Sequence, residues 1–161
     1  MKNLKQLLEH EVQDLYSAES QLLEALPKMA KAANDSKLKK AFEDHLEETK
    51  HQKKRLEKVA ELLGIAPEGE KCKGMEGLLI EGGKMMKEDA DPEVKDAALI
   101  GAAQKVEHYE ISGYGTARQF AEMLGKKEVV NLLAESLEEE KDADETLTDL
   151  AVEKINKMAM A

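Results

Sequence analysis

Six side chains in this sequence are of types that bind metal ions, and they recur at helical spacing. They are Glu19, Glu48, His51, Glu110, Glu140 and Asp144. Glu48 and His51 are three residues apart, and Glu140 and Asp144 are four apart, so each pair would share one face of a helix. Carboxylate and imidazole groups are common ligands of transition-metal ions. The spacing therefore raises the hypothesis of a metal site assembled from several helices.

The position of these acids along their segments supports that hypothesis. Glu19 fills a gap in an apolar stripe that contains Leu15 and Leu22, and Glu110 follows Val106 in another stripe. All six side chains lie within about one turn of the middle of their segment, so side-by-side packing brings them to one level. Unpaired carboxylates in a dry core are costly, and no Lys or Arg lies on the apolar stripes at that level. A pair of metal ions would balance the charge.

The alternative is that each acid is an ordinary solvated charge at the rim of a bundle. Asp and Glu contribute 34 of the 161 residues, so a single acid beside an apolar stripe is common. What favours the metal site is the coincidence of four segments at one level.

Four long segments have the apolar periodicity of helices. We expect helices over residues 3–33, 36–63, 92–124 and 127–157. Pro27 lies inside the first and should kink that helix rather than end it. Residues 34–36 (NDS) offer capping side chains for the second helix, which should end at Gly64. Asp91 and Pro92 mark the start of the third. The predicted fold class is all-α.

The connections between these helices predict the topology. Turns of two or three residues join the first helix to the second and the third to the fourth, so each pair should form an antiparallel hairpin. Residues 65–91 lie between the hairpins, which is enough chain to cross the length of a bundle and to include a short helix. Two hairpins joined by one long crossover form the ferritin-like four-helix bundle. The alternative is a simple up-and-down bundle with a flexible insert.

Composition argues against several classes of partner. The formal net charge of −10 argues against nucleic acid and against anionic membrane surfaces. No stretch approaches the roughly 18 apolar residues of a membrane span, and the start lacks the apolar region of a signal peptide. Cys72 is the single cysteine, which excludes an intrachain disulfide, and we expect it to pack as a small buried apolar residue. We expect one cytoplasmic domain over residues 1–161.

Five stretches resemble the YciE/YciF-type family of bacterial stress proteins in the ferritin-like superfamily. They are DLYSAESQLLEALPKM, HLEETKHQKKRLE, KCKGMEGLLIEGG, AALIGAAQKVEHYEISGYGTA and LEEEKDADETLTDLA. The similarity runs from near residue 4 to near residue 151, and the stretches are specific as a set. The resemblance implies a ferritin-like bundle, a homodimer, a link to stress response and a centre of two iron ions held by carboxylates.

Two features depart from the general di-iron pattern, which carries Glu-x-x-His on two of its helices. The fourth helix has no His, so Glu140 and Asp144 would replace the second Glu-x-x-His pair. That half of the site is then richer in oxygen ligands, which favours manganese as an alternative metal. Glu107 precedes Glu110 by three residues and is either a further ligand or a rim acid.

Two functions fit these observations. The first is a redox metalloprotein whose di-iron or iron–manganese centre reacts with oxygen or peroxide. The second is a non-catalytic stress or partner-binding bundle in which metal is structural or absent. His45, Gln52, Tyr16 and Tyr114 lie at helical spacing from the proposed ligands, and each either hydrogen-bonds to one of them or fills the core.

Overall fold

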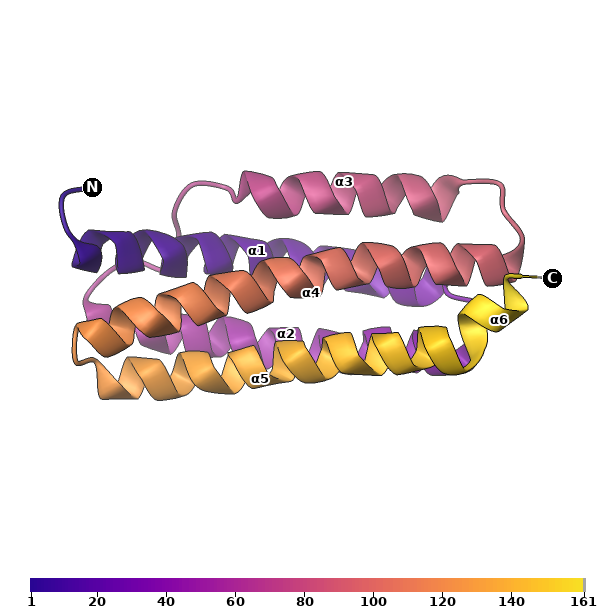
Figure 1. Ribbon diagram of the computed structural model, residues 1–161. Helices are drawn as coiled ribbons and strands as arrows, with labels where there is room; N and C mark the ends of the chain where they lie inside the picture. The colour runs from indigo at the N-terminus through magenta and orange to yellow at the C-terminus, as the bar shows by residue number, and fades with distance from the viewer. Residues whose placement is uncertain (161) are drawn as a thin grey trace.

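The computed structural model describes residues 1–160, which form helices joined by short connections (Figure 1). The elements are α1 (Leu4–Ala32), α2 (Ser36–Leu63), α3 (Lys73–Lys87), α4 (Pro92–Met123), α5 (Lys127–Leu150), the π-helix η1 (Ala151–Ile155) and α6 (Asn156–Met158). Residues 1–160 contain no strand, which confirms the all-α prediction. The expected helix over 127–157 differs in one respect, because a π-helical turn interrupts it after Leu150. α1 continues through Pro27 to Ala32, as expected.

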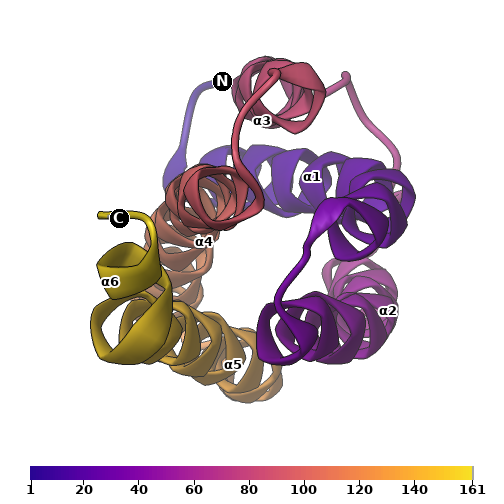
Figure 2. The same cartoon turned by 90° about the vertical axis from the view of Figure 1, so that its right-hand side faces the viewer.

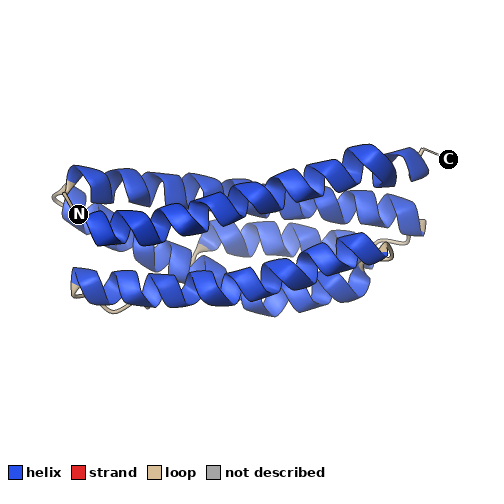
Figure 3. Ribbon diagram, turned by 90° about the horizontal axis from the view of Figure 1, so that it is seen from below, coloured by secondary structure: helices blue, strands red, loops and turns tan. Residues whose placement is uncertain are grey.

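The four long helices form the ferritin-like bundle. α1 and α2 make one antiparallel hairpin, and α4 and α5 make the other (Figure 1), and Figure 3 shows that helices and loops make up the described residues. The crossover between them runs the length of the bundle, so α2 and α4 point in the same direction (Figure 1). α1 packs against α2 and α4, α5 packs against the same two helices, and α3 lies outside the bundle on α1 and α4 (Figure 2). This connectivity excludes the simple up-and-down alternative.

Capping residues fix the start and the end of α2. Asp35 is the N-cap, and its carboxylate accepts hydrogen bonds from the backbone N–H groups of Lys37 and Leu38. The buried Asp96 of α4 accepts hydrogen bonds from the backbone N–H groups of Asn34 and Asp35, which fastens the α1–α2 turn to the second hairpin. Gly64 ends α2 with a φ of 74°, a conformation that other residues rarely adopt.

Buried polar side chains divide the apolar core into two clusters. One cluster surrounds Leu22, Phe42 and Leu99, and the other surrounds Leu15 and Leu56. The polar layer consists of Glu19, His45, Thr49, Gln52, Glu107, Glu110, Ser136 and Glu140. Apolar packing on both sides of this layer keeps water away from its charges. Within residues 1–160, no helix is both long enough and apolar enough to cross a membrane.

Candidate metal centre

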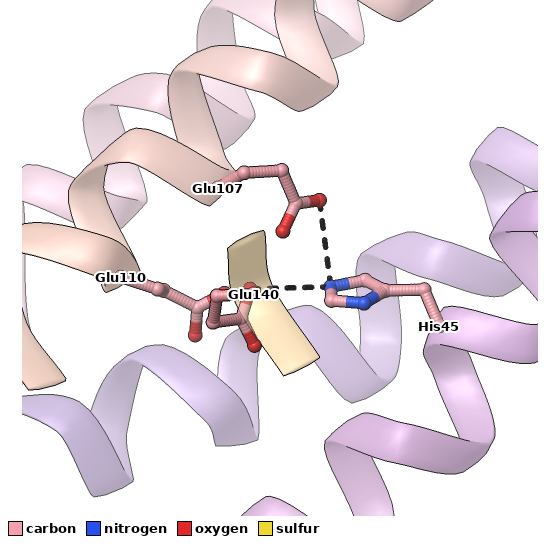
Figure 4. Close-up of side chains that lie close together, drawn as sticks. All are labelled: His45, Glu107, Glu110 and Glu140. Atoms are coloured by element: carbon pink, nitrogen blue, oxygen red, sulfur yellow. Dashed lines mark ion pairs between the residues drawn. The ribbon is translucent and has the colours of Figure 1, made fainter. Parts of the chain in front are cut away.

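Four acidic or imidazole side chains from three helices meet in the centre of the bundle (Figure 4). They are His45 of α2, Glu107 and Glu110 of α4, and Glu140 of α5, and all four are buried. One ligand-type atom of each lies within 4.8 Å of those of the other three. His45 Nε2 is 3.5 Å from Glu107 Oε1 and 3.9 Å from Glu140 Oε2. A cation between these groups would have ligands from three helices.

Glu19 of α1 adds a fourth helix to this layer. Its side chain is fully buried, and its Oε1 accepts a hydrogen bond from the hydroxyl of Tyr114, which is fully buried as well. Burial, and then the nearby charge of Glu140, raise the pKa of Glu19 to about 8. The Tyr114 hydroxyl therefore fixes the position of a carboxyl group that is costly to ionise in the metal-free protein.

The buried group contains many polar atoms without a hydrogen-bond partner among residues 1–160. They are Glu19 Oε2, His45 Nε2, Glu107 Oε2, both carboxylate oxygens of Glu110 and both of Glu140. Native proteins leave few buried polar atoms unpaired, because each such atom costs free energy. A bound cation would satisfy these seven atoms, which lie together in one layer. The residues present therefore fit a metal centre.

The pKa shifts of the same residues lead to the same conclusion. Burial raises the pKa values of Glu107 and Glu110 well above their usual range, and the nearby Glu140 adds to both increases. Burial would lower the pKa of His45, but Glu107 and Glu140 outweigh it and raise that pKa to about 10. The metal-free site therefore holds extra protons in place of the positive charge that a metal ion would bring.

Comparison with known proteins assigns the chain to a family. The family model described as "Domain of unknown function (DUF892)" matches residues 3–160. The chain belongs to this family. It is 48% identical to Protein YciF of Escherichia coli strain K12 over 160 residues, which are 99% of this chain and 96% of YciF. The expected resemblance to the YciE/YciF type is thus confirmed.

Solved structures of relatives have the same architecture. The crystal structure of the E. coli stress protein YciF superimposes with a TM-score of 0.94 at 47% identity, covering 98% of this chain and 99% of YciF. YcfI of Rhodopseudomonas palustris gives a TM-score of 0.89 at 42% identity, covering 92% and 94% of the two chains. A Xanthomonas campestris protein with 22% identity gives 0.75, covers 99% and 95%, and shares the fold.

The structure of this DUF892 protein brings four of the seven predicted site residues into the buried layer. These four are Glu19, Glu107, Glu110 and Glu140. Glu107 is only 2% exposed, so it is not a rim acid. Whether the four bind metal stays a prediction.

Glu48 and His51 lie outside this layer. Glu48 is at the rim, with 41% of its side chain exposed and its Oε2 3.4 Å from His45 Nδ1. His51 is exposed. The buried face of α2 runs through His45, Thr49 and Gln52. Because each residue of an α-helix advances by about 100°, His51 points well away from the face that contains Gln52.

His45 supplies the imidazole of the buried group, although its spacing predicted only a role beside the ligands or in the core. The sequence signal for His45 is its place in the apolar stripe of α2. Leu38, Phe42 and His45 follow one another at steps of four and three residues, and the stripe resumes at Leu56. The Glu-x-x-His spacing drew attention to His51 instead.

Asp144 also lies away from the group. Its carboxylate accepts a hydrogen bond of 3.1 Å from Gln104 Nε2 and is 3.3 Å from Nε2 of the exposed His108. The buried positions before and after it on α5 are Glu140 and Leu147. Asp144 is turned about 40° from Glu140 around the helix axis, which places it on the flank toward α4.

Proposed function

We propose that this DUF892 protein binds two iron ions, or iron together with manganese, in its buried carboxylate layer and reacts with oxygen or peroxide. The observation that carries the proposal is the set of seven buried ligand atoms without a hydrogen-bond partner among residues 1–160. The only imidazole in the layer comes from His45, so the ligands are mostly carboxylate oxygens. Such a donor set suits iron and manganese better than it suits zinc or copper.

The charge of the layer agrees with two divalent ions. Glu19, Glu107, Glu110 and Glu140 carry four negative charges when ionised, and two divalent ions carry four positive charges. A single divalent ion would leave buried negative charge uncompensated, which is strongly unfavourable. Full ionisation of the layer and occupancy by two ions are therefore coupled.

The chain's own residues would bind the ions, orient the ligands and exclude water. Glu110 and Glu140, whose oxygens are all unpartnered within residues 1–160, would hold the ions together with His45 and Glu107. The hydrogen bond from Tyr114 orients Glu19 toward the same layer. Bound iron would supply the electrons for the reduction of oxygen or peroxide, and the two apolar clusters would keep bulk water from the centre.

The stress role rests on the relatives. YciF of E. coli is described as a stress protein, and it matches this chain over nearly the full length of both. A buried metal centre that consumes oxidants would be protective under oxidative stress. A homodimer is a further part of the proposal, and light scattering would test it by giving twice the 17.9 kDa chain mass.

Metal analysis after anaerobic reconstitution tests the centre. The protein is freed of metal with a chelator, incubated with Fe²⁺ or Mn²⁺, and desalted before the bound metal is measured. We expect about two equivalents per chain. Less than about 0.2 equivalents of either metal would overturn the proposal, since structural sites bind far more tightly than desalting can reverse.

Peroxide consumption tests the reaction. The iron-loaded protein is compared with Glu140→Gln, which removes a buried ligand, and with Glu138→Gln, which changes an exposed residue of the same helix. We expect Glu138→Gln to retain the wild-type rate and Glu140→Gln to lose at least about ten-fold. Equal rates for all three proteins would rule out chemistry at this centre.

A further inference from the structure

A small pocket between α2 and α5 opens toward the buried layer. Its volume is about 140 Å³, and its lining residues are Ala41, Phe42, Asp44, His45, Glu48, Glu107, Asp142, Ala143, Thr146 and Leu147. This volume is large enough for water molecules or a small ion.

The inner end of this pocket consists of two residues of the buried layer. His45 and Glu107 line it, and they are 4% and 2% exposed. His45 Nε2 and Glu107 Oε2 have no hydrogen-bond partner in the described chain. Both atoms are shielded from solvent, so the pocket ends against the side chains of two candidate ligands whose unpartnered atoms lie behind its inner wall.

The outer end carries negative charge. Glu48 is 41% exposed on its side chain, and Asp142 is exposed as well. Asp44 also lines the outer end, but Lys40 neutralises it through hydrogen bonds of 2.6 and 2.7 Å. Among the lining residues, all of which the structure describes, His45 is the only one that can carry a positive charge. The entrance therefore attracts cations.

The same pair of helices is closed further along. Arg55 of α2 bridges to α5 through hydrogen bonds to Glu139, at 2.7 Å, and Glu135, at 2.6 Å. Gln52 adds a hydrogen bond of 3.0 Å to Glu139. These contacts hold α2 against α5 at the Gln52 end of the buried layer, whereas small side chains such as Ala41 and Ala143 line the open part.

We propose that this pocket is the entry path of a divalent cation, and that Glu48 binds the cation first and delivers it to His45 and Glu107. The proposal rests on the metal centre proposed above and adds the route by which that centre is loaded. Glu48 is suited to this role because its Oε2 is 3.4 Å from His45 Nδ1 while part of its side chain remains in solvent.

The rate of metal uptake tests the route. Metal-free protein is mixed with Co²⁺, a spectroscopic substitute for Fe²⁺, and its visible absorption is followed by stopped flow. The double variant Glu48→Gln/Asp142→Asn removes two charges at the entrance. The control Glu47→Gln/Glu138→Gln removes two charges from exposed residues of the same helices that do not line the pocket.

We expect the entrance variant to take up Co²⁺ about ten-fold more slowly at low salt, with the same final amount bound, and the control to match the wild type. The difference should shrink at high ionic strength, because salt screens exposed charges. Ala143→Leu, which narrows the pocket without changing its charge, should also slow uptake. Equal rates for the wild type and both pocket variants would overturn the entry path and leave the metal centre standing. Failure of the wild type to bind Co²⁺, Fe²⁺ or Mn²⁺ at equilibrium would overturn the metal centre itself, and the entry path with it.

Discussion

His45 and Glu107 belong to helices that run in the same direction, α2 and α4, and their side chains meet in the middle of the bundle with Nε2 and Oε1 3.5 Å apart. This contact makes the buried layer continuous from α2 to α4. It also couples the ionisation of His45 and Glu107, since removing either group changes the charge that the other faces.

The metal-free protein should lose stability as the pH rises. The pKa of Glu19 is about 4.5 in the unfolded chain and about 8 in the folded one, and those of Glu107 and Glu110 are raised in the same direction. The folded state then holds protons that the unfolded state releases. The resulting stabilisation is complete below pH 4.5 and is lost as the pH rises to about 8. Urea unfolding in the presence of a chelator at pH 5, 6.5 and 8 measures this slope, and an increase in stability over that range would contradict it.

Glu110→Gln should separate the effect of the buried carboxyl groups on the stability of the metal-free protein from their effect on metal binding. The amide resembles the protonated acid, so in chelator the variant should match the wild type at pH 5. At pH 8 it should be more stable than the wild type, because the wild type must keep a proton on Glu110 that its unfolded chain releases, whereas the amide does not titrate. With Mn²⁺ the order should reverse, since ion binding stabilises the wild type by mass action and the variant lacks a ligand. Thermal unfolding with and without Mn²⁺ at both pH values measures each effect, and a variant that is still stabilised to the wild-type extent by Mn²⁺ would show that Glu110 is not a ligand.

Tyr114→Phe should destabilise the metal-free protein by about 1–3 kcal/mol, because Glu19 loses its hydrogen-bond donor while remaining buried. Tyr16→Phe is the matched control. Its hydroxyl makes only a 3.4 Å hydrogen bond to the exposed Glu57, so the change should stay within about 0.5 kcal/mol. Denaturant unfolding of both variants in chelator provides the comparison. Similar values for the two would mean that the Tyr114 hydroxyl contributes no more than a surface hydroxyl.

Arg55→Met should cost about 1–2 kcal/mol of stability, because Arg55 makes four hydrogen bonds that hold α2 against α5 and is only 15% exposed on its side chain. Lys50→Met is the control, since the pair of Lys50 with Glu47 is exposed and should contribute within about 0.5 kcal/mol. The same unfolding assay applies. If Arg55→Met costs no more than the roughly 0.5 kcal/mol expected of an exposed pair, the bridge between α2 and α5 does not add to the stability of the bundle.

Much of the fold could be predicted from the sequence because its signals are local. Asp35, Gly64 and Pro92 mark helix ends through the backbone geometry that each favours, and the structure places those ends where they were expected. The π-helical turn after Leu150 was not predicted. The apolar residues of 151–155 fit an α-helical turn and a π-helical turn, which has one more residue, equally well.

The sequence by itself determined that buried acids from several helices meet at one level, because helix length and apolar spacing together set the height and the face of Glu19, Glu110 and Glu140. The tertiary structure decided which neighbours complete the group. The rotation of α2 about its axis depends on packing against α1 and α5, and because His45 and His51 lie about 120° apart around that axis, the rotation that brings His45 in leaves His51 in solvent. The same rotation places Glu48 at the mouth of the pocket rather than at the centre. Spacing along one helix fixes which residues share a face, but only the neighbouring helices fix where that face points.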